Sequence, residues 1–119
     1  MSTYSPVCTL VWEWAGYLEQ RGHQVKRSAE AFGVLLSHSK LSRRYRWMFL
    51  HTEGSTRRLT AIEHENIKRQ IEAARKARQK AYLVVKFERP VDKVVVMPAE
   101  KAAQVGRVRS DKGGIPWDW

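Results

Sequence analysis

RYRWMFLHT (44–52), TAIEHENIKRQIEAARKARQKA (60–81) and YLVVKF (82–87) follow one another closely, and their order decides the fold class. In the first segment one set of alternate residues is Tyr45, Trp47, Phe49 and His51. The other set is Arg46, Met48 and Leu50. This alternation predicts a strand with two different faces. The third segment is apolar and rich in β-branched residues, which also predicts a strand. The middle segment has helical spacing, so the order is strand, helix, strand.

The helical segment begins with a capping box. Thr60 supplies the capping hydroxyl, and the glutamate three residues later can bond back to the backbone of Thr60. An apolar stripe then runs at helical spacing as far as Ala81. On a helical wheel Arg69, Lys76 and Lys80 lie on the opposite side. We expect a helix from about residue 60 that carries a basic outer face.

The other elements complete one mixed domain. We expect the fold to be α/β (α+β), with a single mixed sheet flanked by two main helices, a short C-terminal helix and an irregular tail. Residues 1–106 would form the domain, and residues 107–119 a basic tail. The remaining expected elements are a helix around 7–18, an extended segment at 23–25, a buried strand over 31–37, a strand over 91–97 and a short helix over 99–105 ended by Gly106.

Positive charge dominates the composition. The 119 residues include 22 Lys and Arg against 12 Asp and Glu, a net charge of +10. Such an excess favours a polyanionic partner, because each phosphate contact releases condensed counterions. We therefore expect DNA or RNA to be bound through its phosphate backbone, with an acidic protein as an alternative partner. The candidate phosphate-binding residues are Arg43, Arg44, Arg46, Arg57, Arg58, Arg69, Lys76, Lys80, Arg107, Arg109 and Lys112.

Aromatic residues stand beside two of these clusters. Tyr45 and Trp47 follow the arginines, where they either stack on unpaired bases or pack in the core. Trp117 and Trp119 end the tail, where they dock on the domain, stack on bases or anchor a protein partner. The sequence leaves these alternatives open.

Signals for catalysis and cofactors are weak. The four histidines are scattered, no phosphate-binding loop, dinucleotide fingerprint or nucleophile elbow is present, and we expect no cofactor. The single Cys8 excludes an intramolecular disulfide framework and a multi-cysteine zinc site. No apolar stretch is long enough to span a membrane, and Glu13 interrupts the first apolar segment. These features predict a protein of the reducing cytoplasm without a membrane partner.

The helix with Glu13 that closes in Gly22-His23-Gln24-Val25 is similar to the opening helix of the restriction-endonuclease-like nucleases. The order of elements that follows also resembles that family. The resemblance implies an acidic residue on one strand and Glu/Asp-x-Lys on the next, where carboxylates hold Mg²⁺. The strands over 31–36 and 46–50 lack both, and Glu30 and Glu53 lie only at their margins. The resemblance therefore implies a nuclease-like scaffold without its metal site.

The sequence is compatible with three functions. The favoured one is that of a non-catalytic accessory factor that binds nucleic acid. The second is a metal-dependent nuclease with a displaced carboxylate set, namely Glu13, Glu30 and Glu53. The third is a protein-interaction subunit anchored by its tryptophan-ended tail. The sequence does not decide between DNA and RNA or between single and double strands, and the edge of the strand over 91–97 can pair two copies into a homodimer.

Overall fold

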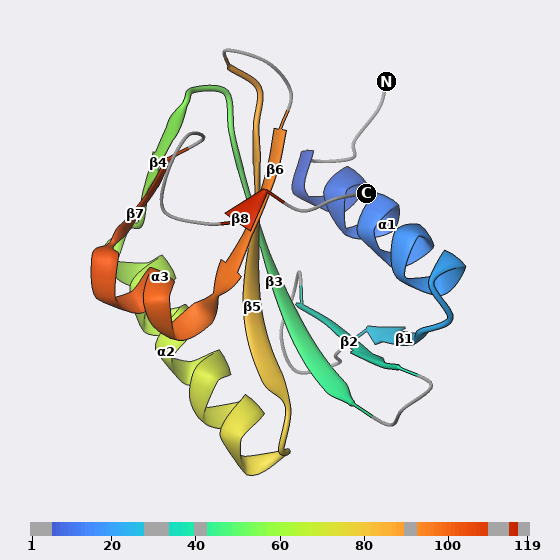
Figure 1. Ribbon diagram of the computed structural model, residues 1–119. Helices are drawn as coiled ribbons and strands as arrows, with labels where there is room; N and C mark the ends of the chain where they lie inside the picture. Colours follow the sequence, from blue (N-terminus) through green and yellow to red (C-terminus); the bar gives the residue numbers. More distant parts are fainter. Residues whose placement is uncertain (1–5, 28–33, 40–42, 90–92, 110–114, 117–119) are drawn as a thin grey trace.

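The structure is a computed structural model that describes residues 6–27, 34–39, 43–89, 93–109 and 115–116. The helices are α1 (Pro6–Gln20), α2 (Ala61–Lys76) and α3 (Ala99–Val105). The strands are β1 (Gln24–Arg27), β2 (Val34–His38), β3 (Arg44–Thr52), β4 (Thr56–Arg58), β5 (Lys80–Phe87), β6 (Lys93–Pro98), β7 (Arg107–Arg109) and β8 (Ile115–Pro116). Figure 1 shows their arrangement.

One mixed sheet organises the molecule. Its strand order is β1-β2-β3-β5-β6-β8, and β4 and β7 form a separate two-stranded sheet. The pair β3 and β5 is parallel, whereas the other neighbours in the large sheet are antiparallel. A parallel pair needs a crossover connection, and α2 lies in it. The predicted fold class is confirmed, and the β4–β7 sheet is an addition to it. The tail was expected to be irregular, but β7 and β8 lie within it and pair with β4 and β6.

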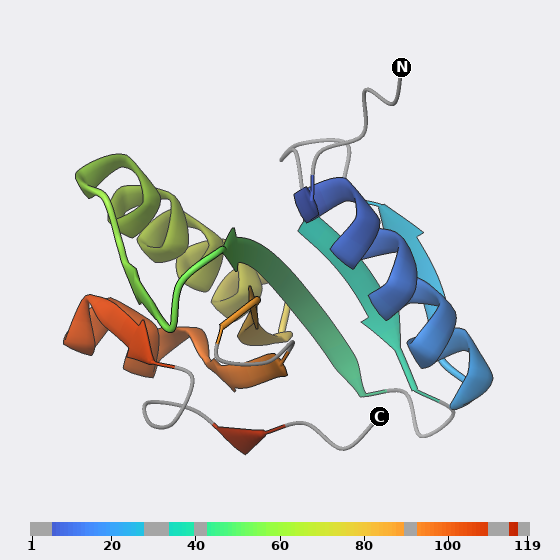
Figure 2. The same cartoon turned by 90° about the horizontal axis from the view of Figure 1, so that it is seen from above.

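Helices cover both faces of the large sheet. α1 lies on one face, and α2, α3 and the β4–β7 sheet lie on the other (Figures 1 and 2). Trp47 and Phe49 of β3 pack in the core under α1, while Met48 packs in the core under α2 and α3. The alternation predicted for the strand over 44–52 is thus confirmed, and the central strands are buried on both faces, as expected for strands with a parallel neighbour.

The start of α2 agrees with the prediction, whereas its end does not. The capping box is present: the Thr60 hydroxyl accepts a hydrogen bond from the Glu63 amide, and the Glu63 carboxylate accepts one from the Thr60 amide. The predicted extension to Ala81 is wrong. The helix ends at Lys76, and Arg78 turns the backbone with a φ of +56°. Lys80 therefore begins β5 and does not share a helical face with Arg69 and Lys76.

The strand edge that we expected to pair two copies is partly occupied. Val95 and Val96 of β6 pair with Pro116 and Ile115 of β8. Residues 117–119, with the two terminal tryptophans, lie outside the described residues. No helix within the described ranges has both the length and the apolar character needed to cross a membrane.

Candidate functional site

Among the predicted phosphate-binding residues that the structure describes, Arg46 alone lies in the interior. It is 6% exposed. Its Nη1 donates to Oε1 of Gln70 at 2.5 Å, and its Nε donates to Oε1 of Gln79 at 2.9 Å. The prediction for Arg46 is wrong, because strand alternation turns its side chain away from the face of Tyr45 and toward α2.

The other predicted basic residues are distributed over several surfaces. Arg57 is half-buried, pairs with the Glu63 carboxylate and donates to the carbonyl oxygen of Arg58. Lys112 lies outside the described residues. The exposed residues are Arg43, Arg44, Arg58, Arg69, Lys76, Lys80, Arg107 and Arg109. No single patch collects the whole set, and their contact with phosphate remains a prediction.

Three exposed arginines meet on the β4–β7 sheet, and we call them the basic ribbon. Arg58 and Arg107 are cross-strand partners, and Arg109 lies two residues further along β7. Residues opposite each other, and residues two apart on one strand, share a face. Val108 lies between the two arginines of β7 and is fully buried on the other face. The buried valine fixes the direction in which the three guanidinium groups point.

A second polar group lies where β3 and β5 end, and we call it the acid–base cluster. It consists of Glu13, His51, Lys86 and Glu88. The Lys86 Nζ is 4.0 Å from Oε2 of Glu13 on α1, and the His51 Nε2 is 3.4 Å from Oε1 of Glu88. His51 and Lys86 are register partners in the parallel pair. Ligands of α/β sheets commonly bind outside the carboxyl ends of parallel strands, so this position suits a functional site.

The acid–base cluster has the groups for proton transfer and for charge stabilisation. A carboxylate that pairs with one imidazole nitrogen holds the proton there and leaves the other nitrogen as a base. The Lys86 side chain is 26% exposed, which lets its ammonium group contact an anion in solvent. The Glu13 carboxylate beside it keeps that ammonium group at the strand end.

A magnesium site of the kind that the resemblance implies does not fit the residues present. Among the positions of β2 and β3 that face α1, Leu35, Trp47 and Phe49 lie in the apolar core, and neither strand carries a carboxylate. Over the described ranges, no three side chains of His, Cys, Asp or Glu gather so that they could hold a metal ion. Of the displaced carboxylate set, Glu13 pairs with Lys86 and Glu53 is exposed after β3, while Glu30 lies outside the described residues.

Comparison with known proteins gives a match in structure. No family model and no curated protein matches the sequence. The chain is similar to Hjc, a Holliday junction resolvase of the archaeal hyperthermophile Archaeoglobus fulgidus, with a TM-score of 0.62 and 17% identity. The match covers 82% of this chain and 75% of the resolvase chain. At this identity the likeness shows a shared fold, which is the restriction-endonuclease-like fold expected from the order of elements.

This match corrects the interpretation that the sequence favoured. A non-catalytic accessory factor is contradicted, because the protein that shares the fold is a nuclease, and the nuclease alternative is better supported. That interpretation rested on the missing carboxylates of two strands. It overlooked groups that come together only in the fold, from α1 and from the ends of β3 and β5.

Sequence reasoning missed His51, Lys86 and Glu88 as a group. One signal was available: Lys86 interrupts the otherwise apolar strand YLVVKF, and a lysine among buried residues needs a partner. The pairing with Glu13 was not visible, because the two residues lie 73 positions apart in the sequence. The homodimer and the acidic protein partner remain predictions.

Proposed function

We propose that this chain is a nuclease that acts on DNA and hydrolyses its phosphodiester bonds. The observation that carries the proposal is the fold shared with a Holliday junction resolvase, at a TM-score of 0.62 over 82% of the chain. Fold alone does not determine chemistry, so a functional site has to supply it. The acid–base cluster at the ends of β3 and β5 is the candidate for that site.

In this proposal His51 is the general base. It takes a proton from a water molecule whose oxygen forms the new bond to phosphorus, while Glu88 stabilises the imidazolium. The phosphorus–oxygen bond to the sugar breaks, and the departing oxygen takes a proton from solvent. Lys86 offsets the negative charge that develops on the phosphate oxygens, and Glu13 positions the ammonium group.

DNA binding is supported by charge. A net charge of +10 favours association with a polyanion, and the basic ribbon offers three guanidinium groups on one face. Guanidinium groups bind phosphate through two parallel hydrogen bonds, which gives orientation as well as attraction. The basic ribbon would hold the backbone, and the acid–base cluster would act on it.

A cleavage assay on labelled four-way junctions, splayed duplexes and linear duplexes tests the proposal, with Mg²⁺, with Mn²⁺ and with EDTA. We expect fragments from at least one of these DNAs. His51→Gln and Lys86→Met should each lower the rate by about 100-fold or more, the range for losing a general base or a charge-stabilising group. Lys68→Met is the matched control, because it removes an exposed lysine of α2, which covers the face of the sheet opposite α1 (Figure 1).

Two results would contradict the proposal at different levels. Absence of fragments from every DNA under all three conditions would overturn nuclease function. Cleavage that persists in His51→Gln and is lost in Glu13→Gln and Glu30→Gln would overturn the role of the acid–base cluster and favour the displaced carboxylate set. Circular dichroism of each variant separates loss of activity from loss of fold.

A further inference from the structure

Three aromatic rings stack at the beginnings of β3 and β5, at the opposite end of these strands from the acid–base cluster. We call Tyr45, Trp47 and Tyr82 the aromatic triad. The ring centroids of Tyr45 and Trp47 are 5.5 Å apart with an interplanar angle of 29°, and those of Trp47 and Tyr82 are 5.2 Å apart at 24°. Tyr45 and Tyr82 are 6.1 Å apart. Each ring therefore contacts the other two.

The central ring is fixed in place. Trp47 is 2% exposed, and its Nε1 donates to the Ser37 hydroxyl at 2.9 Å. The Ser37 hydroxyl also lies 3.4 Å from Nδ1 of His23, and Trp14 packs edge-on against Trp47 at 5.3 Å. A ring held on its edge and on its face loses little further freedom when a ligand binds, which favours affinity.

The outer rings of the triad are only half-buried. Tyr45 and Tyr82 each retain part of their surface in solvent, unlike Trp47. Burial, together with Tyr45 and Glu100, raises the pKa of Tyr82, so its hydroxyl stays neutral near an anion. The triad thus combines a buried, rigid centre with two partly accessible rings, whereas an ordinary core cluster would have all three rings enclosed.

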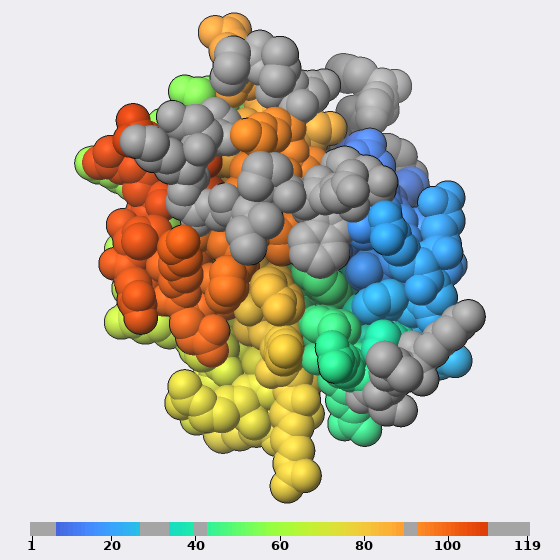
Figure 3. All heavy atoms as spheres, in the orientation of Figure 1, coloured from blue at the N-terminus to red at the C-terminus, as the bar shows by residue number. Residues whose placement is uncertain are grey.

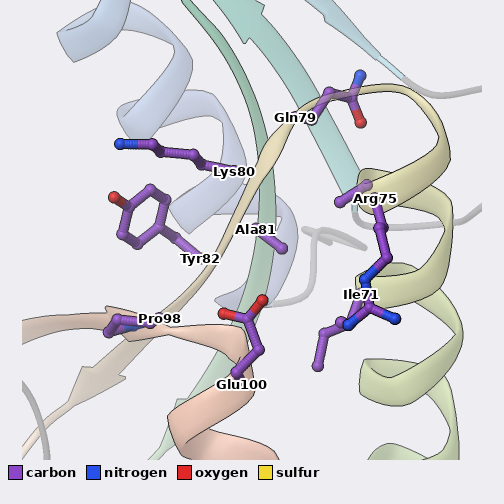
Figure 4. Close-up of a pocket in the computed structure, with 9 residues that line it drawn as sticks. Ile71, Arg75, Gln79, Lys80, Ala81, Tyr82, Pro98 and Glu100 are labelled. Atoms are coloured by element: carbon purple, nitrogen blue, oxygen red, sulfur yellow. The ribbon is translucent and has the colours of Figure 1, made fainter.

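One basic side chain lies beside the accessible rings. Lys80 is the register partner of Tyr45 and is exposed. Lys80 and Tyr82 point to the same side of β5, away from α2 (Figure 4). On the molecular surface the beginnings of β3 and β5 lie side by side (Figure 3). Arg21, just after α1, lies over the ring of Tyr17 at 4.9 Å from its centroid.

A pocket adjoins this surface. It has a volume of about 380 Å³ and lies between the end of α2, the start of β5 and the start of α3, with Lys80 and Tyr82 among its lining residues (Figure 4). This volume falls within the range of small-ligand sites. The pocket is lined by both polar residues, such as Arg75 and Glu100, and apolar residues, such as Ile71 and Ala81.

We propose that the aromatic triad binds an unpaired base of single-stranded DNA by stacking on Tyr45 and Tyr82, with Lys80 on a neighbouring phosphate. Single-stranded nucleic acid is bound by this combination of accessible aromatic rings and basic residues, because every base has a flat face that stacks. Duplex DNA hides that face within its own stack. The assignment to DNA rests on the proposed function, whereas the stacking rests on the geometry of the triad.

The test compares three fluorescent probes of equal length, about 12 nucleotides, which matches the usual site size on a single domain. They are oligothymidine, an abasic oligonucleotide with the same phosphates, and a blunt duplex. We expect wild-type protein to bind oligothymidine about tenfold more tightly than the abasic strand, a typical contribution of one stacked base. Tyr82→Leu should remove this preference, and Tyr82→Phe should keep it.

Two further experiments test the contribution of charge to binding and the fold of each variant. Lys80→Ala should weaken the binding of oligothymidine and of the abasic strand equally, whereas Lys68→Ala, which removes an exposed lysine on α2, should change neither. Thermal melting of each variant shows that it is folded. Equal binding of oligothymidine and abasic strand by wild-type protein would overturn the proposal, as would an unchanged preference in both Tyr82→Leu and Tyr45→Leu.

The outcome also separates this inference from the nuclease proposal. Loss of the base preference in Tyr82→Leu, in a protein that yields no fragments, would support the aromatic triad and overturn the nuclease. Cleavage of DNA by a wild-type protein that shows no base preference would support the nuclease and overturn the aromatic triad. Tenfold tighter binding of oligouridine than oligothymidine would overturn the assignment to DNA.

Discussion

Truncation of Arg46 tests whether the buried guanidinium stabilises the fold or contacts DNA. In Arg46→Ala, Oε1 of Gln70 loses the donor that lies 2.5 Å away, and Gln70 is only 7% exposed. A buried acceptor left unsatisfied costs about 1–3 kcal/mol. Gln79 is half-buried, so water can replace its lost bond. Loss of the packed methylene groups adds about 1–2 kcal/mol.

The expected total is about 3 kcal/mol, which for a domain of this size lowers Tm by roughly 10 °C. Urea denaturation followed by tryptophan fluorescence measures the free energy of unfolding. Arg44→Ala is the matched control on the same strand, since Arg44 is exposed and its removal should change stability by less than about 0.5 kcal/mol. At a temperature where both variants are folded, Arg44→Ala should weaken DNA binding and Arg46→Ala should not.

Equal stabilities of Arg46→Ala and Arg44→Ala would refute this reasoning. Weaker DNA binding by folded Arg46→Ala would also refute this reasoning, because it treats a side chain that is 6% exposed as inaccessible to phosphate. The simultaneous replacement of Arg43, Arg44 and Arg46 is therefore a poor probe of binding, since its third member unfolds part of the population.

Two further predictions concern the basic ribbon and His23. Arg58→Ala and Arg107→Ala should each weaken duplex DNA binding uniformly across sequences. Each should also reduce the slope of log affinity against log salt concentration by about 1, measured by anisotropy titrations at several salt concentrations. An unchanged slope would exclude phosphate contact by the basic ribbon. Burial and the charge of His38 lower the pKa of His23 from 6.5. The unfolded chain then binds the proton more readily, so stability should fall as the pH drops from about 6.5 toward the lowered pKa of the folded state. His23→Gln should flatten this part of the stability profile, and a profile as steep as that of wild-type protein would show that other groups cause it.

Much of the fold could be predicted because local patterns and tertiary structure agree. The alternation in RYRWMFLHT gave a strand whose bounds match β3, and the capping box at Thr60 placed the start of α2. The end of α2 could not be predicted. ARKARQKA continues with good helix formers, and the residue that turns the backbone with positive φ is Arg78, where a glycine would have given the signal.

The candidate site was harder to predict than the fold. The sequence placed Arg46 in a basic cluster because its neighbours are arginines, yet the same alternation that predicted the strand turns it inward. The acid–base cluster could not be predicted from the sequence for another reason. His51 and Lys86 face each other only because the crossover through α2 sets the register of β3 and β5, and no local pattern encodes that register.

The acid–base cluster and the aromatic triad lie at opposite ends of the same two strands and on the same face of the sheet. Tyr45 and His51 are six residues apart on β3, which is roughly 20 Å at the usual rise of a strand. Between them Phe49 and Val84 are buried under α1, so a nucleic acid cannot follow the strands directly. A DNA that reaches both sites must pass around α1 or over β5 and β6. Because of this separation, substitutions at one end leave the other intact, so base binding and bond cleavage can be measured as independent properties of one fold.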